Sequence, residues 1–388
     1  MTSEKTRLVD GVSRRKLIAT TGAAGVAALA GCTESSDGED TDAPTDSGNG
    51  NEGGNSDSDT EETESGDNSG GMDTQPLTAD GSSTVFPITN TGASYWNSNP
   101  EKGDGDYWPT EAAEKVGTDK RLADYWAGLY GYEATGNRSQ PPFLTNVALS
   151  HSGTGVEGVS QGRVDIGDSS APVADELPDA SDEKLNKFID HVVGVDGQPI
   201  VVSKAIYDAG VEQIDIEELK GIYKGDINNW SEVGGPDKEI VALGRATGSG
   251  TATAFRANVF GDPEAQTNPD RRFGQNQQLK QAIAGSDAAI AYIALAFVDV
   301  DAGVQPISLK VEGTTYTYGE NLGAKDYPLS RDLHCYTWED TSRKEAAFLN
   351  FLLSDFGQER FVAPNNYFKL PQERLKEERG KVAASKYE

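Results

Sequence analysis

Residues 244–251 read Gly-Arg-Ala-Thr-Gly-Ser-Gly-Thr, a run of small and hydroxyl-bearing residues that contains one arginine. An apolar run at 240–243 precedes it, and a stretch with helical spacing, 251–259, follows it. This order predicts a strand, a tight turn and a helix whose first backbone N–H groups have no partner within the helix. The partial positive charge at a helix N-terminus favours an anion, and Arg245 adds a forked donor that suits a tetrahedral oxyanion.

Two other turns have the same character. Residues 81–87 (GSSTVFP) and 151–155 (HSGTG) each follow a strand-like run and open a predicted helix. One such turn is most simply explained as a capped helix. Three in one chain, one of them with an arginine, favour an anion site built from backbone amides and hydroxyl groups, and the glycines allow the backbone to approach a ligand closely.

Short apolar runs alternate with helical patterns from residue 76 onward, which predicts an α/β chain with mostly parallel strands. Strands are predicted at 143–150, 164–166, 200–203, 240–243, 289–292 and 333–336, and helices at 156–161, 215–223, 251–259, 277–284 and 343–353. Residues 92–142 are rich in Tyr, Trp, Gly and Asp and have no clear periodicity. We expect them to cover a surface or to extend a helix rather than to join a sheet.

Other motifs in these segments are weaker. Residues 244–251 do not form a Walker A loop, because Ser249 occupies the sixth position and the phosphate-contacting lysine is missing. Residues 158–162 (GVSQG) fit the G-x-S-x-G pattern of serine hydrolases but fall inside a predicted helix. His334 lies in an apolar run and is expected to be a core histidine. With three histidines and two cysteines in the chain, we expect no metal site and no cofactor.

The charge of the chain is strongly negative. Its 388 residues include 63 acidic and 34 basic side chains, for a net charge of -29. Residues 33–75 hold 14 of the acids and no base, which predicts a disordered, extended linker. The excess of acids continues through the rest of the chain, which argues against nucleic acid as a partner and is typical of proteins from halophiles.

The N-terminus has the order of an export signal. Residues 13–18 (SRRKLI) carry paired arginines, a short apolar run follows, and residues 29–32 read LAGC. This order predicts a twin-arginine lipoprotein signal over 1–32, with lipid attached at Cys32. We therefore expect an exported protein, anchored through that lipid to the outer face of the cytoplasmic membrane.

Across 76–388 the chain resembles the substrate-binding proteins of phosphate ABC transporters, a type II periplasmic-binding-protein family. The segments that carry the resemblance are GSSTVFP from 81, SGTGVEGVSQGRVDIGDSSAP from 152, LKGIYKGDINNW from 219, GRATGSGT from 244, AAIAYIALAF from 288 and YPLSR from 327. The match is weak over 92–142, which is longer than the family leads us to expect.

The resemblance implies an α/β, two-lobed type II periplasmic-binding-protein fold with two interlobe crossovers, near Val195 and Tyr327. Lobe I would comprise 76–195 and 328–388, and lobe II 196–327. It also implies a receptor, not an enzyme, that closes on inorganic phosphate by a hinge motion and delivers it to ABC transporter permease subunits. Sulfate or another tetrahedral oxyanion stays open as the ligand. A phosphate-ester hydrolase and a structural surface protein are the alternatives from other classes.

The resemblance also implies which residues hold the anion. In the first turn Val85 occupies a position where the family often has a hydroxyl, so Thr84 is expected to supply it, with the Val85 or Phe86 N–H as a second donor. The remaining expected donors match the family's motifs: Ser152, Arg245, Ser249, Gly250 and Thr251.

The third segment of the expected site departs from the family. Ser170 stands where some members carry the carboxylate that accepts the proton of monohydrogen phosphate. A hydroxyl can also accept a hydrogen bond, so phosphate remains allowed, but discrimination against sulfate weakens. Asp168 is the alternative acceptor, unless it simply points outward from the end of its strand. Cys335 is expected to be a buried, inert thiol.

Overall fold

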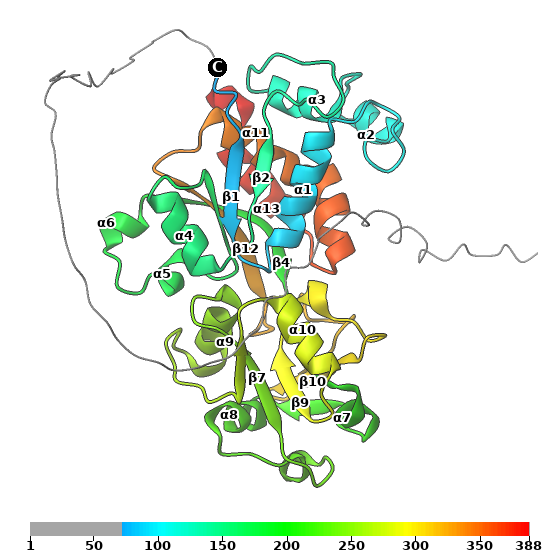
Figure 1. Ribbon diagram of the computed structural model, residues 1–388, viewed down its shortest axis with the longest axis vertical. Helices are drawn as coiled ribbons and strands as arrows, with labels where there is room; N and C mark the ends of the chain where they lie inside the picture. The colour runs from blue at the N-terminus through cyan, green and yellow to red at the C-terminus, as the bar shows by residue number, and fades with distance from the viewer. Residues whose placement is uncertain (1–71, 388) are drawn as a thin grey trace, which may run out of the picture. The chain divides into compact units, whose positions relative to one another are not determined.

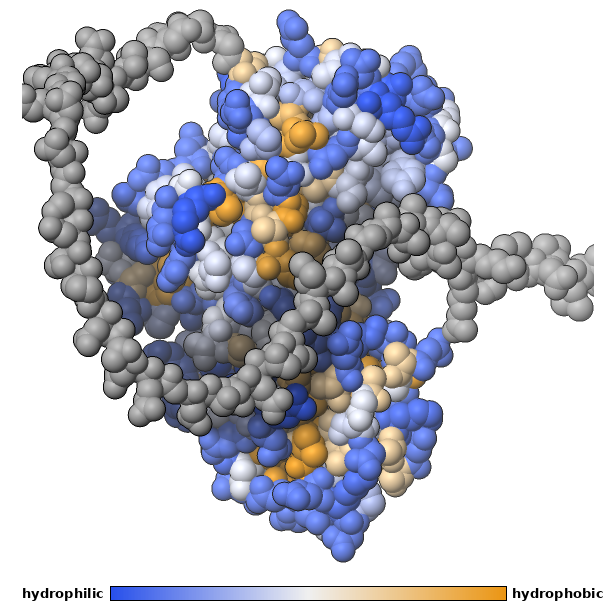
Figure 2. All heavy atoms as spheres, viewed as in Figure 1, coloured by the Kyte–Doolittle hydropathy of each residue, from blue (hydrophilic) through white to orange (hydrophobic). Residues whose placement is uncertain are grey.

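The computed structural model describes residues 72–387, which belong to one compact unit, Asn68–Glu388 (Figure 1). The predicted signal with Cys32, and the linker up to residue 71, lie outside the described residues. Within 72–387, no helix has both the length and the apolar character needed to cross a membrane. Hydrophilic residues cover most of the face drawn in Figure 2.

The first sheet has the strand order β2-β1-β3-β12-β4. Its strands are β1 (Leu77–Gly81), β2 (Thr145–Val147), β3 (Ile166–Ser169), β4 (Phe188–Asp196) and β12 (Arg331–Trp338). The helices in the same parts of the chain are α1 (Phe86–Ser98), α2 (Thr110–Lys115), α3 (Leu122–Gly128), α4 (Ser152–Ser160), α5 (Val173–Glu176), α6 (Asp182–Leu185), α11 (Arg343–Leu352), α12 (Asp355–Gly357) and α13 (Gln372–Lys381). Figure 1 shows α1 and α4 on either side of β1.

The second sheet has the order β11-β10-β5-β9-β7-β8, and β6 pairs with β10. Its strands are β5 (Ile200–Ser203), β6 (Gln213–Asp215), β7 (Val241–Arg245), β8 (Arg271–Phe273), β9 (Ala289–Tyr292), β10 (Val304–Val311) and β11 (Thr314–Tyr316). Its helices are α7 (Lys204–Asp208), α8 (Ile216–Lys224), α9 (Gly250–Phe260) and α10 (Asn276–Ala284). Short helical turns at Trp230–Val233, Leu295–Phe297, Gln358–Val362, Ala363–Asn365 and Ala384–Lys386 complete the described chain.

The chain passes between the sheets twice, once from β4 to β5 and once from β11 to β12. The two crossing segments touch, because the Tyr327 hydroxyl donates to the Gln198 carbonyl at 3.3 Å. At the ends of the crossings, Asp196 of β4 and Arg331 of β12 face each other in register across the antiparallel pair. β4 therefore ends, and β12 begins, at one place.

The prediction of mostly parallel strands is wrong. Of the ten strand pairings in the described residues, five are parallel and five antiparallel. The antiparallel pairs all involve β5, β10 or β12. β5 and β12 are the strands that follow the crossings, and each is antiparallel to both of its neighbours. The directions therefore depend on the crossings, which apolar periodicity does not report.

Residues 92–142 contribute to the core of the first sheet's half and form no strand. Residues 92–98 extend α1, and the rest of the segment supplies α2, α3 and their connections. Trp96 and Trp126 are buried and lie against the aromatic face of α11, with the Trp96 ring 5.8 Å from Phe348 and the Trp126 ring 6.0 Å from Phe351. The segment extends a helix, as expected, but its tryptophans are buried instead of covering a surface.

Candidate functional site

Helices α1, α4 and α9 begin at one place. The Oγ1 atom of Thr84, just before α1, lies 3.0 Å from the Oγ1 atom of Thr251 in α9. Ser152, the first residue of α4, has its Oγ atom 3.5 Å from that of Ser170 at the end of β3. Ser82 donates to the Ser170 hydroxyl at 2.9 Å. The three turns that stand out in the sequence therefore come together with Ser170, and we name these hydroxyl side chains the hydroxyl cluster: Ser82, Ser83, Thr84, Ser152, Ser170 and Thr251.

At the hydroxyl cluster, elements of the first sheet's half are in direct contact with elements of the second sheet's half. A Cβ atom at Gly250 would lie 2.3 Å from the Ser152 Oγ and 2.7 Å from the Ser170 Oγ, so only glycine fits there in this arrangement. Beside it, the Gly153 N–H donates to the Gly248 carbonyl at 3.2 Å. Because Gly250 is the first residue of α9, the small-residue run allows the two helix N-termini to approach each other.

Arg245 brings a positive charge into the cluster. Its side chain is almost fully buried and donates to Ser83 Oγ at 3.1 Å and to Thr251 Oγ1 at 3.2 Å. Its other three acceptors are the Asn276 side-chain oxygen and the carbonyls of Phe273 and Gly274. All five acceptors are neutral. Burial lowers the pKa of Arg245 to about 9, so the guanidinium remains charged at neutral pH.

Three residues of the site were missed by the sequence reasoning. Asn276, the first residue of α10, donates to Ser83 Oγ and Thr84 Oγ1, both at 3.1 Å. Arg331 forms a buried ion pair with Asp196 and also donates to Thr84 and Thr251. Arg331 ends the YPLSR segment quoted above, which was the available signal. Asn276 and Asp196 lie in none of the quoted segments.

The expectation that the Val85 or Phe86 N–H group is a second donor in the first turn needs correction. The N–H groups of Val85 and Phe86 both donate to the Ser82 carbonyl, at 3.1 and 2.9 Å, and so they close the turn instead of facing the cluster. The Val85 side chain is buried. Thr84 is placed as expected, with its hydroxyl in the cluster.

Ser249 has the position expected for the start of α9. It is the N-cap residue, and it is buried. Its backbone N–H donates to Ala246 at 3.2 Å, and its carbonyl accepts from the first turn of the helix. Ser249 and Gly250 therefore contribute to the cluster mainly by forming the turn that carries Thr251 into it.

Asp168 is not part of the cluster. It lies in β3 and is buried, but its carboxylate accepts hydrogen bonds from Thr89 Oγ1 at 2.8 Å and from the Cys335 thiol at 3.3 Å. Thr89 is in α1 and Cys335 in β12, so the carboxylate points into the core of the first sheet's half. Burial raises the pKa of Asp168 to about 7, and it also raises that of Cys335. Cys335 is buried, as predicted.

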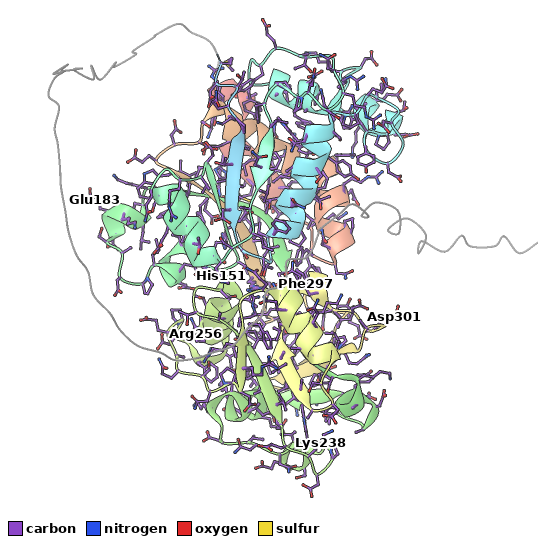
Figure 3. All side chains as sticks on the ribbon, in the orientation of Figure 1. His151, Glu183, Lys238, Arg256, Phe297 and Asp301 are labelled. Atoms are coloured by element: carbon purple, nitrogen blue, oxygen red, sulfur yellow. The ribbon has the colours of Figure 1, made fainter. Side chains whose placement is uncertain are left out.

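Within residues 72–387, none of the three histidines forms a hydrogen bond to a serine hydroxyl of the cluster. His334 is buried and is 2.9 Å from an Asp190 carboxylate oxygen, which confirms its prediction as a core histidine. His191 contacts Thr341 Oγ1 at 3.0 Å. His151, labelled in Figure 3 near the passage between the sheets, caps α4 and would lie 3.4 Å from a Cβ atom at Gly274.

Two further expectations from the sequence concern a hydrolase motif and a metal site. Residues 158–160 of the G-x-S-x-G match lie within α4, as predicted, and not on a strand-to-helix elbow. Across 72–387, no group of three or more His, Cys, Asp and Glu side chains is arranged to hold a metal ion.

Comparison with known proteins identifies relatives of this chain. A family model described as "PBP superfamily domain" matches residues 131–355. The phosphate-binding protein PstS of Bacillus subtilis is 31% identical over 223 residues, which cover 57% of this chain and 69% of that protein. The phosphate-binding protein PstS of Staphylococcus saprophyticus is 27% identical over 243 residues, covering 60% of this chain and 73% of the relative.

Solved structures show the same fold. A substrate-binding protein from Clostridium perfringens, assigned to phosphate ABC transport and solved with bound phosphate, aligns with a TM-score of 0.56 and 23% identity, covering 76% of this chain and all of that one. An ABC-type phosphate transport receptor from Vibrio cholerae aligns with a TM-score of 0.51 and 22% identity, with the same coverage. The fold is thus the α/β, type II periplasmic-binding-protein fold that the sequence predicts. The chain belongs to the PBP superfamily and, within it, to the family of phosphate-binding proteins PstS.

Proposed function

We propose that this chain is a receptor for inorganic phosphate and that the hydroxyl cluster, with Arg245, holds the anion between two lobes. The lobes would be 76–195 with 328–388, and 196–327, each built around one of the two sheets. The residues we propose as the phosphate site are Thr84, Ser152, Ser170, Arg245, Ser249, Gly250 and Thr251.

The observation that carries this proposal is the charge of Arg245. A guanidinium buried among neutral acceptors keeps an uncompensated positive charge, which is costly in a protein interior. An anion in contact with it would remove that cost. Hydrogen bonds to a charged group contribute roughly 1.5 to 3 kcal/mol each, so a few donors from Arg245 and the hydroxyl cluster offset the dehydration of a small oxyanion.

Calorimetric titration of the protein with inorganic phosphate in high salt tests the proposal. We expect saturable binding, and we expect Arg245→Ala to weaken it at least tenfold. Arg271→Ala is the matched control, because Arg271 is exposed on the neighbouring β8 and stacks on Phe273. Absence of saturable binding, or equal affinity of the Arg245→Ala protein, would overturn the proposal.

Sulfate remains a second candidate ligand because of the acceptors near the cluster. The Ser170 side chain is a hydroxyl, and the nearest carboxylate on its strand, Asp168, is bound by Thr89 and Cys335. Among the groups that face the cluster, the Asn276 oxygen already accepts from Arg245. A site composed of donors accepts any tetrahedral oxyanion, so we propose weak discrimination between phosphate and sulfate. Titration with sulfate under the same conditions measures it directly.

A receptor is favoured over a hydrolase by the partners of Ser152. Its hydroxyl accepts from the Ser170 N–H at 3.2 Å and lies against the Ser170 hydroxyl, whereas a nucleophilic serine needs a basic partner. We expect no turnover of a chromogenic phosphate ester by the purified protein. Turnover that Ser152→Ala abolished would favour the hydrolase instead.

We further propose that the receptor works outside the cytoplasm and delivers phosphate to ABC transporter permease subunits. The supporting observations are the family membership and the signal pattern at 1–32, with Cys32 as the lipid attachment residue and 33–75 as the tether. A Cys32→Ser variant should be released from the cell surface into the medium. Retention of that variant on the membrane would contradict the lipid anchor without affecting the binding proposal.

A further inference from the structure

Arg331 lies at the point where the first crossing between the sheets begins and the second one ends. It is the first residue of β12, and it faces Asp196, the last residue of β4, in register. The Asp196 Oδ2 atom accepts from Arg331 Nε at 3.0 Å and from Nη2 at 2.7 Å. The Asp196 Oδ1 atom accepts from the Leu295 N–H at 2.9 Å. Asp196 is fully buried, so this carboxylate holds the guanidinium in one orientation.

The remaining N–H groups of Arg331 point at the hydroxyl cluster from both sides. The Nη1 atom donates to the carbonyls of Ser170 and Gly250, each at 3.2 Å. The Nη2 atom also contacts Thr251 Oγ1 at 3.2 Å and Thr84 Oγ1 at 3.4 Å. Ser170 and Thr84 belong to the first sheet's half, and Gly250 and Thr251 to the second's. One side chain therefore connects the two walls of the site.

Two arginine side chains donate hydrogen bonds to the Thr251 hydroxyl. A hydroxyl has one proton and two lone pairs. The Thr251 oxygen accepts from Arg245 Nη1 and from Arg331 Nη2, both at 3.2 Å, so both lone pairs are occupied by charged donors. The only group left to Thr251 is its proton, which can be donated to the Thr84 oxygen 3.0 Å away in this arrangement. The Thr84 oxygen also faces the donors of Asn276 and Arg331, so the pair of hydroxyls has no acceptor site left for a ligand and offers it only a proton.

We infer that Arg331, oriented by Asp196, is a positioning residue that makes Thr84 and Thr251 obligate hydrogen-bond donors toward the bound anion. This inference rests on the proposed function of the hydroxyl cluster. A hydroxyl that accepts from a cation is polarised and donates more strongly. Arg331 thus acts through the two threonines, and it biases the site toward oxyanion oxygens that carry no proton.

The test uses Arg331→Lys, in the full chain, with phosphate titration and thermal unfolding. Lysine keeps the charge opposite Asp196 but cannot bond Asp196 and both threonines at once. We expect a melting temperature close to that of the wild type and a phosphate Kd at least tenfold higher. Arg374→Gln is the matched control: it removes a partly buried arginine from the neighbouring Asp332 of β12, and it should leave the Kd within twofold.

A double-mutant cycle separates positioning from a structural role. In a Thr251→Val background the loss from Arg331→Lys should shrink to about threefold, since one of the two hydroxyls that Arg331 polarises is gone. If Arg331→Lys does not fold, the double variant Asp196→Asn/Arg331→Gln leaves no unpaired buried charge and should show the same loss of affinity.

Two results would overturn the inference: wild-type affinity in folded Arg331→Lys protein, or a full tenfold loss that persists in the Thr251→Val background. These results differ from failure of the proposed function. If that function fails, the wild-type protein does not bind phosphate, or Arg245→Ala leaves its affinity unchanged.

Discussion

The Cys335 thiol donates a hydrogen bond to the Asp168 carboxylate at 3.3 Å, and the two side chains are buried together behind the hydroxyl cluster. This contact removes the carboxylate from the side of the strand on which Ser170 meets the cluster. A carboxyl group two residues from the proposed site is thereby part of the core, and its charge has consequences for stability instead of for the ligand.

Asp168 should make the protein less stable as the pH rises. Its pKa is about 7 in the folded protein against 3.8 in the unfolded chain, so the folded state binds the proton more tightly between these values. The contribution to stability is complete below pH 4 and is lost as the pH rises to about 7. Asp168→Asn should raise the free energy of unfolding at pH 8 by roughly 1 to 3 kcal/mol.

Urea denaturation of wild type and Asp168→Asn at pH 5 and pH 8 measures this effect. Asp287→Asn is the control, because Asp287 is exposed and its pKa is lowered by Lys238, so its removal should not stabilise at pH 8. Phosphate affinity should change less than threefold in Asp168→Asn. A large loss of affinity would show that Asp168 reaches the ligand.

Ser170→Asp should raise the selectivity of the site. A carboxylate at this position would accept the proton of monohydrogen phosphate and repel sulfate, which has no proton to donate. We expect the ratio of phosphate to sulfate affinity to increase at least tenfold at pH 8, as measured by titration with each anion. An unchanged ratio would mean that residue 170 does not contact the ligand.

Gly250→Ala should prevent the two halves from meeting as they do here. The added Cβ atom would lie 2.3 Å from the Ser152 hydroxyl oxygen, well inside van der Waals contact. We expect phosphate affinity to fall at least tenfold and small-angle scattering to give a larger radius of gyration with phosphate present. Gly380→Ala is the control, since a Cβ atom there meets nothing within 4 Å. Normal affinity in Gly250→Ala would place the anion elsewhere.

Trp96→Ala should destabilise the fold without affecting the site. Trp96 is fully buried, donates to the Phe143 carbonyl at 2.9 Å, and packs edge-on against Phe348. Its truncation should lower the free energy of unfolding by about 3 to 5 kcal/mol. Tyr107→Ala, at a half-exposed aromatic of the same segment, should cost about 1 kcal/mol or less. If Trp96→Ala lowered the free energy of unfolding no more than Tyr107→Ala does, this segment would not be part of the core.

Local sequence signals predicted the small-residue turns and part of the secondary structure, but not the strands β4 and β10. The strands at 200–203 and 289–292 have their predicted bounds, because each is a short apolar run whose every residue is buried. Helix α4 begins at Ser152, four residues before the predicted start at 156. Its first turn consists of glycine, serine and threonine, which favour caps and turns, so composition alone places them before the helix.

The three turns, the α/β class and Arg245 were determined by the sequence itself, because each depends on residues adjacent in the chain. Only the tertiary structure decided that Asp168 faces Cys335, that Val85 and Phe86 close their turn on Ser82, and that Arg331 pairs with Asp196. Asp196 and Arg331 are 135 residues apart. Their contact depends on the register of two antiparallel strands and on the direction of two crossings, and neither quantity is encoded in any local periodicity.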